Sequence, residues 1–256
     1  MAIIIKNNSQ IELMRISGRI VAEAHDAIEK AIKPGVTTKE LDSLCVDVIK
    51  KHGAIASFLG YEGAFGAGPY PGSACISIND EVIHGIPGLR SLKNGDIVSV
   101  DIGAYMNGYH GDAARTHIVG EASDEDKKLV EVTRQSFFEG IKFAKAGRHL
   151  YEISEAIQNY VESHGFSIVR DYVGHGVGKN LHESPEIPNY KPLRGRGVKL
   201  EKGMTLAIEP MVNAGTYEIY VLDDLWTVVT VDGKSSAHYE NTIAITDGEA
   251  EILTNL

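Results

Sequence analysis

The fold is decided by residues 96–119, DIVSVDIGAYMNGYHGDAARTHIV. Apolar and polar residues alternate on both sides of Asn107-Gly108, a dipeptide that favours the backbone of a two-residue β-turn. The pattern predicts a long antiparallel hairpin in which Met106 faces Tyr109 across the turn.

This register places two acidic residues on one face of the hairpin. Asp101 would lie opposite Ala114, and Asp112 would lie opposite Gly103. The two aspartates are then diagonal neighbours about 7–8 Å apart, so their carboxylates could share a pair of divalent ions. Without a cation the like charges would repel each other. The alternative is two turn or edge residues in solvent, and the pair alone does not decide between them.

Helix and strand signals continue outward from the hairpin. Apolar residues at helical spacing follow Ser9, the expected N-cap, as far as Pro34-Gly35. A second helix is expected from Thr37 to His52-Gly53. Further helices are expected at 123–145 and 149–164, and short strands at 73–84, 166–174, 204–213, 224–231 and 237–246.

The two helical pairs have glycines at the same spacing. Gly35 and Gly53 are 18 residues apart, and so are Gly147 and Gly165. This spacing favours a duplicated unit over two unrelated helix-turn-helix units, although glycine after a helix is common. We predict a single catalytic domain over residues 1–256, with pseudo-symmetric halves at 9–118 and 123–246. Its fold class is α+β, in which two pairs of helices cover a curved antiparallel sheet.

Residues 173–182, VGHGVGKNLH, place two histidines in a glycine-rich stretch. Glycines let another group approach the backbone closely, but they argue against a shared helix face. His175 and His182 are therefore equally consistent with ligands and with structural histidines. Other histidines would be interpreted as structural if met alone: His84, His110, His117 and His238.

Two glutamates interrupt apolar strands. Glu209 lies in MTLAIEPM (204–211), where a buried carboxylate is costly unless it is paired or bound to metal. Pro210 cannot donate to a sheet ladder, so the strand is expected to end or bulge at Glu209. Glu240, in SAHYENTIAI (236–245), would share a polar face with Thr242, opposite Ile243. An exposed edge residue is the alternative for each glutamate.

The composition excludes several classes of protein. The chain has 256 residues, a formal net charge of −10 and two cysteines without CxxC spacing, which argues against a disulfide framework or a zinc–thiolate site. The acidic balance disfavours DNA and anionic membranes as partners. The apolar run at residues 2–5 is too short for a signal peptide, and no run reaches the roughly 20 residues of a membrane span. We therefore predict a cytoplasmic protein.

Five motifs together resemble those of the type I methionine aminopeptidases, a family with a two-halved pita-bread fold. They are SINDEVIHGIP (77–87), DIG and GDAART (101–103 and 111–116), GHGVGKNLH (174–182), LAIEP (206–210) and YENT (239–242). The resemblance covers essentially the whole chain, in the family's order. It implies cotranslational removal of the initiator methionine, with a preference for a small second residue.

The resemblance also implies a ligand set for two divalent ions: Asp101, Asp112, His175, Glu209 and Glu240. One imidazole and four carboxylates suit Mn, Fe(II), Co or Zn. His84 matches a histidine near the scissile nitrogen, and His182 one near the scissile carbonyl. Glu209 is expected to accept the proton of the attacking water.

Further positions follow from the same comparison. The methionine pocket is expected to be lined by Tyr61, Tyr70, Cys75 and Trp226, and a monovalent cation is expected near Asn79 and Ser236. Two departures from the family pattern concern the pocket. The segment 63–70 is longer and richer in glycine than the family's loop, and Leu181 stands where many relatives carry an aromatic residue.

The expected partners are nascent polypeptide N-termini, and nothing in the sequence requires more than a monomer. The basic stretch Lys191–Lys202 could contact ribosomal RNA, although a solvated loop is the favoured interpretation. The rival functions are a prolidase-like or X-Pro aminopeptidase of the same fold, and a binding protein that has lost its metals. The complete set of five ligands disfavours the second rival.

Overall fold

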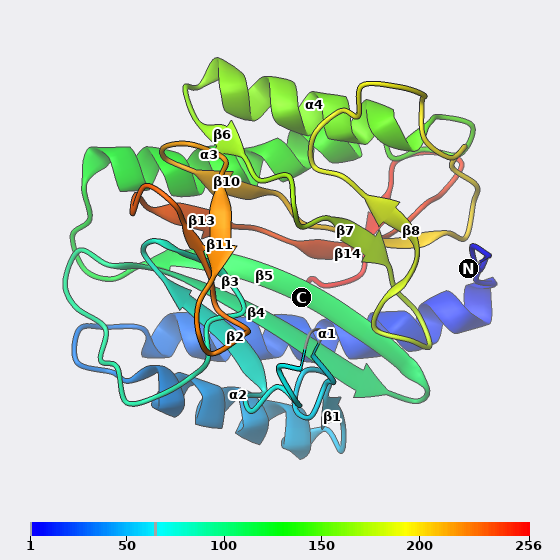
Figure 1. The fold of residues 1–256 in the computed structure, drawn as a ribbon. Helices are drawn as coiled ribbons and strands as arrows, with labels where there is room; N and C mark the ends of the chain where they lie inside the picture. Colours follow the sequence, from blue (N-terminus) through cyan, green and yellow to red (C-terminus); the bar gives the residue numbers. More distant parts are fainter. Residues whose placement is uncertain (1, 64–65) are drawn as a thin grey trace.

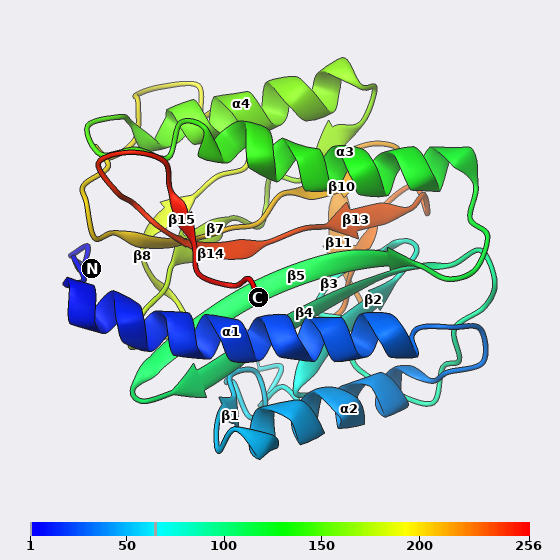
Figure 2. The ribbon, with the colours of Figure 1, turned by 180° about the vertical axis from the view of Figure 1, so that it is seen from behind.

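The computed structural model describes residues 2–63 and 66–256 and confirms the α+β architecture. Two pairs of helices enclose a layer of strands, with α3 and α4 above it and α1 and α2 below it in Figure 1. The helices are α1 (Asn8–Ala31), α2 (Thr38–Lys51), α3 (Asp124–Ile141) and α4 (Leu150–Ser163). From behind, α1 and α3 lie across the strands (Figure 2). Among the described residues, no helix combines the length and apolarity that crossing a bilayer requires.

The described strands pair antiparallel and divide into four hydrogen-bonded sheets rather than one. One sheet contains β1 (Ile55–Ala56), β2 (Ala74–Ile78), β4 (Ile97–Met106) and β5 (Tyr109–Ile118). The largest runs in the order β15 (Glu251–Ile252), β14 (Asn241–Ala244), β9 (Thr205–Ile208), β7 (Gly174–Gly176) and β8 (Glu183–Ile187). The two smaller sheets run β13 (Ser236–His238), β10 (Met211–Asn213), β6 (Ser167–Ile168), and β11 (Ile219–Val221), β12 (Val228–Thr230), β3 (Glu81–Ile83).

Helix α1 begins two residues earlier than expected. Asn7, not Ser9, is the N-cap, because its side chain accepts a hydrogen bond from the backbone N–H of Gln10 while the Gln10 side chain accepts one from Asn7. The second helix begins as predicted, with Thr37 and Glu40 in the same reciprocal arrangement. Both helices bury one apolar face against the strands.

The helical pairs of the two halves match at the predicted positions. Helices α2 and α4 each contain 14 residues. Each helix is preceded and followed by a glycine with positive φ, at Gly35 and Gly53 in one half and at Gly147 and Gly165 in the other. A two-residue strand follows in both halves, β1 and β6. This correspondence is what a duplicated unit would produce. The duplication itself stays a prediction.

Each half has its own apolar core. Residues such as Ile28, Val98 and Ile102 pack together between the first helical pair and its sheet. Phe137, Ile157 and Leu206 belong to the corresponding core of the second half. A smaller apolar cluster, which includes Met14 of the first half and Ala207 of the second, packs where the halves meet.

Candidate active site

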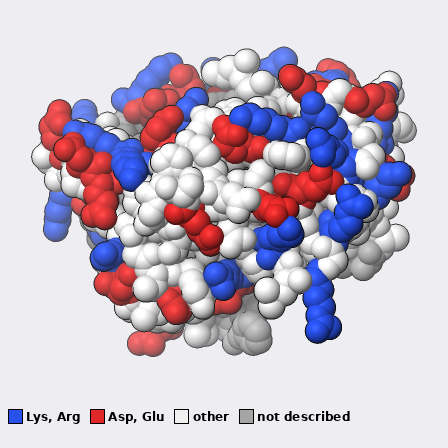
Figure 3. Space-filling model, turned by 90° about the horizontal axis from the view of Figure 1, so that it is seen from above, with Lys and Arg blue, Asp and Glu red and all other residues white. Residues whose placement is uncertain are grey.

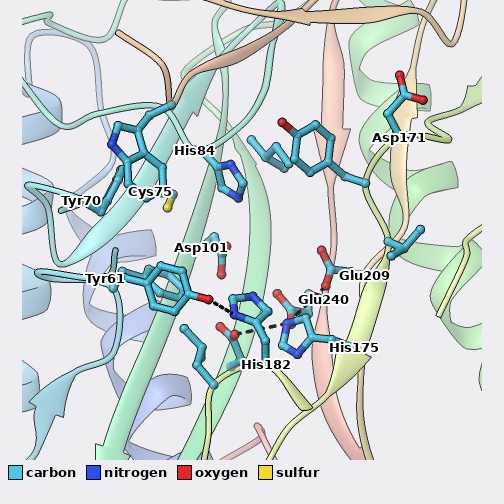
Figure 4. A pocket seen from close by; sticks show the side chains of 17 residues that line it. Tyr61, Tyr70, Cys75, His84, Asp101, Asp171, His175, His182, Glu209 and Glu240 are labelled. Carbon is cyan, nitrogen blue, oxygen red and sulfur yellow. Dashed lines mark hydrogen bonds and ion pairs between the residues drawn. The ribbon is translucent and has the colours of Figure 1, made fainter. Parts of the chain in front are cut away.

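One cavity of about 350 Å³ is lined by side chains from both halves (Figure 4). All eleven residues that the sequence assigned to metal, catalysis or the methionine pocket line it: Tyr61, Tyr70, Cys75, His84, Asp101, Asp112, His175, His182, Glu209, Trp226 and Glu240. In Figure 4, Tyr61, Tyr70 and Cys75 lie on one side, and His175, Glu209 and Glu240 lie on the other.

The hairpin β4–β5 has the predicted register. Met106 pairs with Tyr109, Asp101 with Ala114, and Gly103 with Asp112. The turn residues Asn107 and Gly108 have φ values of 54° and 86°, the left-handed backbone that Asn-Gly favours. Asp112 is only 3% exposed. Its backbone exchanges two hydrogen bonds with the Thr242 hydroxyl, at 3.0 and 2.9 Å, which ties the hairpin to β14 of the other half.

The two glutamates lie at interruptions between strands. Strand β9 ends at Ile208 and β10 begins at Met211, so the predicted end of a strand at Glu209 is confirmed. The expected single strand at 237–246 is wrong, because it divides into β13 and β14 around Glu240. These strands belong to different sheets. The Glu240 N–H then donates to the Ala114 carbonyl at 2.9 Å, beside Asp101 in the hairpin.

His175 faces this carboxylate group with an unprotonated nitrogen. Its Nδ1 lies 2.9 Å from the Gly176 carbonyl oxygen, which can only accept, so Nδ1 carries the proton. Nε2 lies 3.5 Å from Glu209 Oε1 and 3.9 Å from Asp112 Oδ2. Ligand atoms of Asp112, His175 and Glu240 all lie within 4.8 Å of one another. Several electron-pair donors therefore converge on one point.

The burial of four carboxyl groups beside His175 favours the binding of a cation. Burial raises the pKa of Asp101 to about 7 and raises the pKa of the Asp112, Glu209 and Glu240 carboxyls above their ordinary values. Burial also lowers the pKa of His175 to about 3. Three buried carboxylate oxygens lack any hydrogen-bond partner: Asp101 Oδ1, Asp112 Oδ1 and Glu240 Oε1. Oxygen and imidazole donors without partners fit a divalent metal ion.

Aromatic and apolar side chains form the other side of the cavity. The rings of Tyr70 and Trp226 meet edge to face at 5.0 Å, and the Tyr70 hydroxyl donates to the Gly85 carbonyl at 2.8 Å. Cys75 pairs with Asp101 between β2 and β4, and burial raises the pKa of its thiol. Leu181 is 5% exposed and also lines this side. The segment 63–70, which differs from the family's loop, includes residues 64 and 65, and these two lie outside the described residues.

Two histidines lie between the carboxylates and the aromatic side. His84 has a left-handed backbone, with φ of 60°, and its ring meets that of Trp226 edge to face at 6.2 Å. His182 Nδ1 lies 2.7 Å from the Tyr61 hydroxyl, and the His182 and His175 rings are 4.2 Å apart. The cavity thus joins a polar cluster to an aromatic pocket through two imidazoles.

Several residues at the site were not predicted from the sequence, and two residues that were predicted for a cation site do not line the cavity. Asp171 and Tyr172 line the cavity, and His238 Nε2 lies 3.8 Å from Glu209 Oε2 without a hydrogen-bond partner. No spacing in the sequence marks these positions. Asn79 and Ser236 are not among the residues that line the cavity, but they touch, with the Ser236 N–H donating to the Asn79 carbonyl at 2.8 Å.

Residues 12–247 match the profile of metallopeptidase family M24. The chain belongs to this family. It is 56% identical to methionine aminopeptidase 1 of Bacillus subtilis over 254 residues, which cover 99% of this chain and 100% of that protein. The resemblance to the methionine aminopeptidases is therefore confirmed.

Solved structures of similar proteins confirm the pita-bread fold. The methionine aminopeptidase of Thermotoga maritima superposes with a TM-score of 0.95 at 48% identity, covering 100% of both chains. The Xaa-Pro dipeptidase of Bacillus anthracis gives a TM-score of 0.76 at 25% identity, covering 98% of this chain and 62% of that chain. The fold is thus shared by proteins whose names indicate different substrates.

Proposed function

We propose that this M24 member removes the N-terminal methionine from nascent polypeptides whose second residue is small, by hydrolysis that uses two divalent metal ions. The observation that carries this proposal is one cavity in which a carboxylate–histidine cluster adjoins an aromatic pocket. The relatives named methionine aminopeptidase support the same substrate.

The metal ligands in this proposal are Asp101, Asp112, His175, Glu209 and Glu240. Their buried oxygens without partners and the free Nε2 of His175 fit Mn, Fe(II), Co or Zn. When bound, such ions supply Lewis-acid chemistry and bring the pKa of a nearby water toward neutrality. We also propose a monovalent cation near the touching residues Asn79 and Ser236.

Three side chains do the remaining work in the proposed reaction. Glu209 accepts the proton of the attacking water and returns it to the leaving amine, for which its buried position suits it. Nδ1 of His182 lies 2.7 Å from the Tyr61 hydroxyl; with the hydroxyl as donor, Nε2–H of His182 stabilises the developing oxyanion. His84 holds the substrate near the scissile nitrogen.

Specificity arises at the two ends of the cavity. The substrate's methionine side chain packs among Tyr61, Tyr70, Cys75 and Trp226, which bury apolar surface and favour contact with sulfur. The free N-terminal amine lies toward the carboxylates. Because an internal peptide bond has no such amine, the enzyme acts only at chain ends.

The proposed setting is the cytoplasm, where a monomer meets nascent chains. Ribosome contact through Lys191–Lys202 is the weaker part of this proposal. Lys191 pairs with Glu155 at 2.6 Å, and Lys202 pairs with Asp247 at 2.5 Å. On the face above α3 and α4, basic and acidic side chains are interspersed (Figure 3). Such pairing weakens the attraction to a phosphate backbone.

The test measures methionine release from Met-Ala-Ser and hydrolysis of a matched Ala-Pro-Ser peptide by the metal-loaded protein. We expect Met-Ala-Ser to be preferred, and we expect Glu209→Gln to lower kcat by about a hundredfold or more because the proton acceptor is lost. Glu186→Gln, an exposed glutamate of β8, is the control and should leave kcat unchanged. Near-normal turnover in Glu209→Gln or in His84→Ala would refute the assigned roles. Preference for the Xaa-Pro peptide would indicate a prolidase-like enzyme instead.

A further inference from the structure

A buried ion pair lies outside the candidate active site and joins distant parts of the chain. Lys6 Nζ donates to Glu183 Oε2 at 2.6 Å, and both side chains are only 3% exposed. Neither residue lines the cavity. Removing two charges from water costs free energy that their attraction does not always return, so a buried pair is weak evidence for stability alone. The Lys6–Glu183 pair is therefore a candidate for a role other than stability.

The pair lies inside the loop that carries His182. Between β7, which ends at Gly176, and β8, which begins at Glu183, the backbone leaves the strand ladder. The second oxygen of Glu183, Oε1, accepts from the Asn180 N–H at 3.2 Å. A Cβ atom at Gly178 would lie 2.6 Å from Lys6 Cε and 2.7 Å from Glu183 Oε1. The loop is therefore folded tightly around the two charged side chains.

Lys6 is itself held in place by its backbone. Its N–H donates to the Gly203 carbonyl at 2.8 Å, and a Cβ atom at Gly203 would lie only 2.4 Å from the Lys6 carbonyl oxygen. The start of the chain lies beside β8 in both ribbon views (Figures 1 and 2). The ammonium group is thus a fixed point against which the loop can be positioned.

His182 needs such a fixed point because it is exposed rather than packed in a core. It directly precedes Glu183, and its ring is held on the other side by the Tyr61 hydroxyl. We infer that the Lys6–Glu183 ion pair positions His182 in the cavity, which makes the segment before α1 a working part of the site. Lys6 and Glu183 are positioning residues, and their catalytic consequence rests on the proposed function.

The experiment separates positioning from stability by comparing single and double variants. Lys6→Met or Glu183→Gln alone leaves one buried charge without its partner and should lower Tm, whereas the double variant Lys6→Met/Glu183→Gln should recover most of the loss. If the pair positions His182, the double variant keeps a kcat about tenfold below wild type. Its KM and its metal affinity by calorimetry should stay close to wild type. The exposed pair Lys30–Asp26, also at 2.6 Å, supplies the control Lys30→Met/Asp26→Asn, which should change none of these quantities.

An NMR measurement keeps the outcome independent of the assumed reaction. The imidazole signals of His182, assigned by their loss in His182→Gln, should shift in the double variant and stay unchanged in the control. A stable double variant with wild-type kcat and an unshifted His182 signal would overturn the inference. If the wild-type protein released no methionine, the proposed function would fail, but the His182 signal would still test the positioning role.

Discussion

The two halves of the molecule each bring two carboxylates to the candidate metal cluster, from different kinds of backbone. In the first half, Asp101 and Asp112 lie within β4 and β5, which run for ten residues each. In the second half, Glu209 and Glu240 lie at breaks between short strands of different sheets. The aspartates reach the site from within a strand. The glutamates reach it from a strand break, with a side chain that is longer by one methylene.

The helices show the opposite relation. Helices α2 and α4 have the same length and the same flanking glycines, although they cover different strand arrangements. A helix needs only its caps and one apolar face, whereas the strands must deliver particular atoms to the cavity. The halves therefore agree in their scaffold and differ in the backbone that carries the site.

The largest expected effect comes from removing metal, because both halves contribute carboxylates to one buried cluster. With divalent metal at about a thousand times its Kd, binding should stabilise the native state by roughly 4 kcal/mol and raise Tm by about 10 °C. Differential scanning calorimetry with a chelator and then with excess Mn²⁺ measures the change. An unchanged Tm would contradict a joint metal site.

The chelated protein should also lose stability as the pH rises from about 6.5 to 8. In the unfolded chain these carboxyls are already ionised, while in the folded chain Asp101, with a pKa of about 7, and the other three lose protons only at higher pH. The folded chain therefore binds more protons than the unfolded chain over this range, so its stability falls as the pH rises. Below pH 6.5 the histidines with lowered pKa, such as His175, act in the opposite direction. Bound metal should abolish the decline.

A smaller effect should follow from changing the length of the side chains that carry the carboxylates. Glu240→Asp withdraws a carboxylate at a strand break, and Asp112→Glu pushes one out of the hairpin. A displacement of about 1 Å should lower kcat/KM roughly a hundredfold in each case. Peptide hydrolysis and calorimetric metal titration provide the measurements. If Glu240→Asp bound metal and turned over normally, the difference between the two halves would have no functional meaning.

The smallest expected effect tests whether helix caps in both halves contribute stability without affecting activity. Thr37 caps α2 in the first half and Ser123 caps α3 in the second, each accepting from a backbone N–H three residues later. Thr37→Ala and Ser123→Ala should each cost about 1 kcal/mol of stability in urea unfolding and leave kcat unchanged. A loss of activity in either variant would show that its helix cap does more than stabilise the scaffold.

The sequence predicted those features that depend on neighbours along the chain. The Asn107-Gly108 turn and the alternation on both sides of it specify the hairpin register, and with it the placement of Asp101 and Asp112. Pro210 ends a strand because it has no N–H, which placed Glu209 correctly. The N-cap of α1 was misplaced because Asn7 and Ser9 are both good caps, and only the reciprocal bond with Gln10 distinguishes them.

Only the tertiary structure decided which distant atoms meet. The division of residues 236–244 around Glu240 depends on β13 and β14 pairing with different strands, which the residues themselves do not reveal. His238 near Glu209, and Lys6 against Glu183 across 177 positions, are likewise consequences of packing. Local sequence determines backbone dihedrals over a few residues. The positions of remote side chains depend on how whole elements pack, and that packing assembles the site.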